Sequence, residues 1–236
     1  RSAPFLLIGV FVVLVMGVTS ALPAHMVSLL RENGLSQAWA ITVPASIGLV
    51  QVVGRALLYF FEHHVDVHTT NRVIPCLLPA GLACLLAAPW LAGWIDGGPL
   101  ALTLLFVLLY GLGNGMVTIV KGTVMAQYID RHHVASLNGA LGVPTALARA
   151  VAPLMLGVLW TREAGYSHGL MVLLALGILA VAALMQAQRL ALRRQVAAQQ
   201  DRLPAQIAEL GAALVGRMLQ QGLVQMVGAV LELVDH

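Results

Sequence analysis

The most informative shortage in this sequence is a shortage of charge. Only 10% of its 236 residues are Asp, Glu, Lys or Arg, whereas 59% are hydrophobic. A soluble globular domain carries about 25% charged residues. The chain therefore lacks the ionic surface that keeps a protein of this size dissolved in water, which excludes an ordinary soluble fold.

The few charges are also kept out of long stretches of the chain. Five runs contain no Asp, Glu, Lys or Arg at all, and a sixth is interrupted only by Arg149. These runs are 2–30, 33–54, 73–95, 97–120, 164–188 and 132–161. Because roughly 20 apolar residues cross the hydrocarbon core as a helix, we predict six transmembrane spans and a protein embedded in membrane lipid.

Alternation of apolar and polar residues, the mark of a transmembrane β-barrel strand, is missing from these runs. The predicted fold class is therefore all-α, a polytopic transmembrane six-helix bundle. No cleavable signal peptide is recognisable, since Arg1 leads directly into the first apolar run. A chain that begins with arginine is expected to be a fragment or a processed form.

Cysteine is scarce too. Cys76 and Cys84 fall eight positions apart in the predicted third span, too far along a helix axis to form a disulfide. The polar stretch from Glu62 to His68 holds three histidines and two carboxylates, but we interpret it as a solvated loop and not as a metal site. With no nucleophile–base pair or cofactor motif in view, we predict neither an enzyme nor a cofactor. The formal charge of +3 does not indicate a nucleic-acid partner.

The distribution of arginines predicts the orientation. If the connections alternate between two sides, one side holds seven arginines and the other holds two. The first set is Arg1, Arg55, Arg72, Arg131, Arg189, Arg193 and Arg194, and the second is Arg31 and Arg162. By the positive-inside rule, both ends of the six-helix unit lie in the cytoplasm, with the spans in the plasma (inner) membrane.

The last part of the chain differs in composition. We divide the sequence into a transmembrane part, 1–194, and a cytoplasmic tail, 195–236. In the tail, apolar residues recur at helical spacing, and Leu203-Pro204 indicates a helix start. An amphipathic helix at the membrane surface or against a partner is predicted there.

Polar side chains form a stripe in the predicted fourth span. Tyr110, Asn114, Thr118 and Lys121 are spaced so that they share one face of a helix. An ionised group inside a span costs about 3 kcal/mol on insertion scales. Lys121 can reduce that cost by extending its long side chain to the interface. We predict that this face lines a cavity, with Tyr110 and Asn114 in contact with a solute.

The predicted fifth span carries a second stripe, formed by Asn138, Gly142, Thr145 and Arg149. Arg149 lies near the middle of its span and cannot easily reach the interface. No Asp or Glu occupies any predicted span, so Arg149 needs a carbonyl, a partner chain, water or an anionic solute. Arg149 leads the predicted solute-binding residues, with Lys121 and Thr145 beside it.

Two further residues are candidates from other spans. The first span is interrupted at Ala21–His25, where Pro23 removes a backbone donor, and broken helices at membrane depth line cavities. His25 is therefore a candidate solute or proton contact, or else a histidine bonded to a neighbour near the interface. Gln51, near the middle of the second span, either contacts the solute or bonds another helix.

The quoted residues also match a known pattern. The stretches GLGNGMVTIVKGT and SLNGALGVPTALARAVAPLMLGVLW, together with Ala164-Gly165-Tyr166, resemble the C-terminal six-helix half of a major facilitator superfamily transporter. Gly54-Arg55 stands where that superfamily repeats its loop signature. The signature is degraded, because Leu58 replaces the acidic residue and Glu62-His63-His64 replaces the basic cluster. The match covers about residues 4–189 and excludes the tail.

The resemblance implies alternating access, in which two halves rock around a site at the membrane midplane and each half consists of inverted three-helix repeats. It implies an N-terminal six-helix half as a partner. The positive charges of Arg149 and Lys121, and not the resemblance, predict that the solute is a small organic anion. Two alternatives remain open: an exporter of drugs or other hydrophobic compounds from the same superfamily, and a non-transporting membrane scaffold.

Overall fold

The computed structural model of the chain describes residues 3–61, 64, 66–91, 98–129 and 134–234. Every regular element in these ranges is an α-helix, and one isolated β-bridge joins Thr161 to Gly165. The helices are α1 (Ala3–Ala21), α2 (Met26–Glu32), α3 (Gln37–Phe61), α4 (Val67–Leu91), α5 (Gly98–Tyr128), α6 (Val134–Ala140), α7 (Gly142–Val158) and α8 (Ser167–Val234). The predicted all-helical class is confirmed.

Several of these helices are suited to a bilayer. Within the described residues, α1, α3, α4, α5 and the first part of α8 are each long and apolar enough to cross one. Helices α6 and α7 pass the same test only as a pair, bent by 41° at their junction. The structure therefore offers five candidate spans, or up to six if the bent pair forms one span.

The interruption predicted in the first span is present. Helix α1 ends at Ala21 and α2 begins at Met26. Helix α2 then ends in a tight turn around Gly34, whose φ is +83°, with the amide of Leu35 donating to the carbonyl of Leu30. This is the Schellman arrangement, which favours glycine because its left-handed conformation costs other residues energy. Helix α3 follows over Gln37–Phe61, which are the bounds that the sequence predicts for the second span.

The predicted loop before the third span is shorter in the structure, because α4 begins at Val67 instead of Val73. The carboxylate of Asp66 accepts a 3.1 Å hydrogen bond from the backbone amide of Thr69, which caps the first turn. His68 and Asn71 are consequently helical, contrary to the prediction of a loop. Glu62, His63 and Val65 lie outside the described residues.

The predicted helix start at Pro204 is wrong. Pro204 lies inside α8, which begins at Ser167 and ends at Val234. Proline interrupts a helix by removing one backbone bond, and here both Pro204 and Gln200, the residue that loses this bond, are exposed. Water can hydrate such a carbonyl. By its internal packing, the chain divides into two units, Arg1–Leu190 and Ala191–His236.

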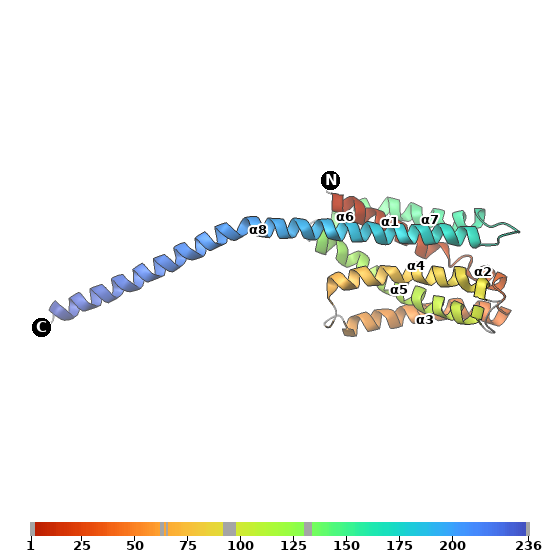
Figure 1. Cartoon of the computed structure of the whole chain (residues 1–236), viewed down its shortest axis with the longest axis horizontal. Helices are drawn as coiled ribbons and strands as arrows, with labels where there is room; N and C mark the ends of the chain where they lie inside the picture. The colour runs from red at the N-terminus through yellow and green to blue at the C-terminus, as the bar shows by residue number, and fades with distance from the viewer. Residues whose placement is uncertain (1–2, 62–63, 65, 92–97, 130–133, 235–236) are drawn as a thin grey trace. The chain divides into compact units, whose positions relative to one another are not determined.

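Within the first unit, glycines allow α3 and α5 to lie in close contact (Figure 1). A Cβ atom at Gly115 would collide with the backbone carbonyl of Gln51, and one at Gly111 would lie 2.7 Å from Val50. Only glycine permits this approach. Helix α1 packs against α7, where Gly17 faces Ala148, but a Cβ atom at Gly17 would lie 3.7 Å from Ala148, an ordinary van der Waals contact.

Candidate functional site

A cavity of about 400 Å³ lies between α5 and the α6–α7 pair, and we call it the cationic cavity. This volume falls within the range of about 300–1,000 Å³ for ligand pockets. The polar residues that line it are Thr118 and Lys121 from α5, Asn138 from α6, and Thr145 and Arg149 from α7. The structure thus brings the two predicted polar stripes to one cavity. The first stripe contributes only Thr118 and Lys121, whereas all four residues of the second stripe line the cavity.

Lys121 and Arg149 both line this cavity, and no residue in the described ranges supplies a counterion there. Lys121 is half-buried and Arg149 is exposed to the cavity side of α7. None of the described residues that line the cavity is acidic. Among the described residues, none forms an ion pair with Lys121 or Arg149. Such a cavity favours an anion, because two like charges repel one another until an opposite charge is bound.

Thr145 adds a directional group to the cationic cavity. Its side chain is only 8% exposed, and its Oγ1 atom has no hydrogen-bond partner within the described residues. Buried hydroxyl groups are nearly always bonded, since an unsatisfied one costs about 1–3 kcal/mol. A bound solute with an acceptor oxygen would satisfy the Thr145 hydroxyl beside the two cations.

Tyr110 and Asn114 do not line this cavity. Tyr110 is 1% exposed, its hydroxyl donates a 3.1 Å bond to the carbonyl of Thr19, and its ring stacks on Phe106. It joins α5 to α1 in the core. Asn114 is half-buried one turn before Thr118. The backbone of Gln51 packs on Gly115 at the α3–α5 contact, away from the cavity lining.

His25 occupies a different end of the unit. Its Nε2 lies 3.0 Å from the carbonyl oxygen of Pro153, and its Nδ1 lies 3.2 Å from the hydroxyl of Tyr166. Both contacts are satisfied when Nε2 carries the proton and donates, while Nδ1 accepts from the tyrosine. His25 therefore joins the α1–α2 break to α7 and to the α7–α8 turn. This arrangement matches the alternative of a histidine bonded to its neighbours.

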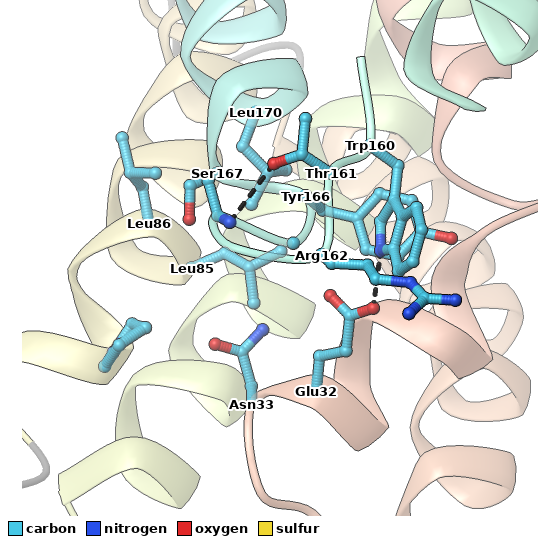
Figure 2. Close-up of a pocket in the computed structure, with 13 residues that line it drawn as sticks. Glu32, Asn33, Leu85, Leu86, Trp160, Thr161, Arg162, Tyr166, Ser167 and Leu170 are labelled. Atoms are coloured by element: carbon cyan, nitrogen blue, oxygen red, sulfur yellow. Dashed lines mark hydrogen bonds between the residues drawn. The ribbon is translucent and has the colours of Figure 1, made fainter. Parts of the chain in front are cut away.

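A second cavity, of about 350 Å³, lies near His25 and was not anticipated from the sequence (Figure 2). We call it the hairpin cavity, because the turn from Trp160 to Ser167 forms one of its walls. Figure 2 shows Glu32 of α2 directed at Trp160, whose Nε1 donates a 2.7 Å hydrogen bond to Oε1 of Glu32. Arg162 also lines it.

A polar network ties α4, α5 and α8 together inside the first unit. The hydroxyl of Tyr128 lies 2.9 Å from Nδ1 of His68 and accepts a 3.4 Å bond from Nδ2 of Asn71. Gln188, only 1% exposed, donates to the carbonyl of His68 and accepts from Nε of Arg72. In the sequence, the N-cap pattern Asp66-x-x-Thr69 was the signal that could have placed His68, Asn71 and Arg72 on a helix.

No group of three or more His, Cys, Asp or Glu side chains within the described ranges is arranged to hold a metal ion. Comparison of the chain with protein-family models, with curated proteins and with solved structures finds no match.

Proposed function

We propose that this chain is the C-terminal six-helix half of a major facilitator superfamily transporter that carries a small organic anion across the membrane. In this proposal α6 and α7 form one span, an N-terminal half supplies the opposite wall of the site, and both ends of the unit lie in the cytoplasm. The observation that carries the proposal is the cationic cavity, in which Lys121 and Arg149 meet beside an unsatisfied Thr145 hydroxyl.

Charge is the first support. A cation within a membrane span is costly and commonly marks an ion or solute pathway. Two such cations line one cavity whose described lining residues include no carboxylate, and they produce a positive potential there. The same potential disfavours cationic drugs, so an anion carrier fits this half better than an exporter of hydrophobic cations.

The pairing of helices is the second support. In two inverted three-helix repeats, the first helix corresponds to the fourth and the second to the fifth. Exchanging the two repeats replaces the first helix by the fourth and the fifth helix by the second. If the first helix packs against the fifth, the fourth must therefore pack against the second. Helix α1 packs against α7, and α5 packs against α3, as this exchange demands when α6–α7 counts as the fifth helix.

Uptake by the complete transporter, in which this half is reconstituted in liposomes together with its N-terminal half, tests the proposal. We expect the wild type to accumulate at least one of radiolabelled lactate, succinate or phosphate, and Arg149→Gln to lower the initial rate at least tenfold. Arg149→Lys should retain part of the rate, because it keeps the charge but loses the planar fork that binds oxyanions.

Arg162→Gln is the matched control, since Arg162 lines the hairpin cavity and lies outside the cationic cavity. Its uptake should equal that of the wild type. Equal rates for Arg149→Gln and the wild type would contradict the anion site, and absence of flux for all three solutes would favour the membrane scaffold.

A further inference from the structure

Arg55 on α3 lies one hydrogen-bonded step from the cationic cavity. Its Nε atom donates a 3.2 Å bond to the backbone carbonyl of Gly115 on α5. The hydroxyl of Thr118 donates a 2.9 Å bond to the same oxygen. Thr118 lines the cavity. One carbonyl oxygen therefore holds the Arg55 guanidinium and a cavity-lining hydroxyl side by side.

The close packing of α3 on α5 explains how Arg55 reaches this position. The Gln51 backbone touches α5 at Gly115, and Arg55 follows Gln51 by four residues, so it projects from the same face of α3 one turn later. A bulkier residue at Gly115 would force the helices apart and withdraw Arg55 from the Gly115 carbonyl. The glycines of α5 thus position a cation that belongs to another helix.

The Arg55 guanidinium has donors to spare. Its Nε is committed to Gly115, but the side chain is exposed and the two Nη groups bond no described residue. These two groups form part of the planar fork that binds carboxylates and phosphates through paired hydrogen bonds. Lys121 and Arg149 line the cationic cavity, and Arg55 adds a third cation next to its lining residue Thr118, through the shared carbonyl of Gly115.

We infer that Arg55 is a third anion-binding residue and that the solute carries two separated anionic groups, as a short dicarboxylate does. One group binds at Arg149 and Thr145 on α7, the other binds at the two Nη groups of Arg55 between α3 and α5, and Lys121 lies on α5. This inference rests on the proposed function, because it assigns the class of solute to the same cavity.

Binding measured by isothermal titration calorimetry on the purified protein, at constant ionic strength and pH 7, tests this assignment. The probes are acetate, succinate and inorganic phosphate. We expect the wild type to bind succinate at least tenfold more tightly than acetate. Arg55→Gln should remove this preference, bringing succinate within twofold of acetate, while acetate and phosphate affinities stay within twofold of their wild-type values.

Other results overturn the inference. It fails if Arg55→Gln leaves the succinate preference intact, if it weakens all three probes equally, or if phosphate loses affinity as succinate does. A melting temperature equal to that of the wild type without solute verifies that Arg55→Gln is folded. If Arg55→Gln is not folded, Thr118→Val is used in its place, because it removes the hydroxyl that shares the Gly115 carbonyl with Arg55. Thr118→Val must then lower the succinate preference for the inference to stand.

Failure of the proposed function would look different. In that case Arg149→Gln would bind all three probes as the wild type does, or the wild type would bind none of them. Loss of all binding in Arg149→Gln together with an unchanged succinate preference in Arg55→Gln would keep the anion site and reject only the role of Arg55.

Discussion

The indole Nε1 of Trp160 donates a 2.7 Å hydrogen bond to Oε1 of Glu32, across 128 residues of sequence. This bond joins the end of α2 to the turn that connects α7 with α8. The other carboxylate oxygen of Glu32 lies against Gly165, where a Cβ atom would collide with it. The short helix after the α1–α2 break is thereby held by the turn on the opposite side of the hairpin cavity.

Removing the indole donor should loosen this attachment. Trp160→Phe keeps an aromatic ring but leaves Glu32 without its bond. We expect the free energy of unfolding to fall by about 1 kcal/mol, at the low end for a charge-assisted bond, because both side chains are exposed. Thermal unfolding in detergent measures this. A double-mutant cycle with Glu32→Gln that shows no coupling would contradict it.

The α3–α5 contact predicts a strong effect at one glycine and none at another. Gly115→Ala places a methyl group on the Gln51 carbonyl and should lower the free energy of unfolding by about 1–3 kcal/mol, a typical cost of overpacking. Gly48→Ala on α3, where nothing lies within 4 Å, is the control. Its melting temperature should equal or exceed that of the wild type, because alanine favours helix. Similar losses in both variants would argue against the contact.

Thr145 provides a test in which stability and binding change in opposite directions. Thr145→Val keeps the shape and removes the unsatisfied hydroxyl, so without solute the free energy of unfolding should rise by about 1 kcal/mol. Succinate affinity should fall, because the hydroxyl no longer bonds the anion. Calorimetry and thermal unfolding on the same preparation measure both changes. If succinate binds equally well, Thr145 does not contact the solute.

The Tyr128 network predicts a loss of stability that is independent of solute binding. Tyr128→Phe removes the hydroxyl shared by His68 and Asn71 and should lower the free energy of unfolding by about 1–3 kcal/mol, since Asn71 is only 2% exposed. Tyr59→Phe changes a tyrosine that is 69% exposed and should leave the melting temperature unchanged. Equal melting temperatures for Tyr128→Phe and the wild type would show that the network contributes little.

Sequence reasoning was most accurate where local chemistry decides the outcome. The bounds of α3, the break after Ala21 and the two polar stripes follow from apolar run length, proline and helical spacing, all of which are properties of neighbouring residues. It failed at Pro204 and at the start of α4. At Pro204 the helix continues where water can hydrate the carbonyl of Gln200. At the start of α4, the Asp66 carboxylate bonds the backbone amide of Thr69. Composition does not reveal either arrangement.

By itself, the sequence determined that the chain is helical and has several apolar segments long enough to cross a membrane. It also determined that Lys121 and Arg149 lie within two of these segments. Which polar residues meet was decided only by tertiary structure. The Tyr110 hydroxyl bonds the carbonyl of Thr19, and the His25 ring bonds the carbonyl of Pro153. Arg55 bonds the carbonyl of Gly115, because glycines allow α3 to pack closely on α5. Helical spacing assigns a residue to a face, but the packing of helices far apart in sequence decides what that face meets.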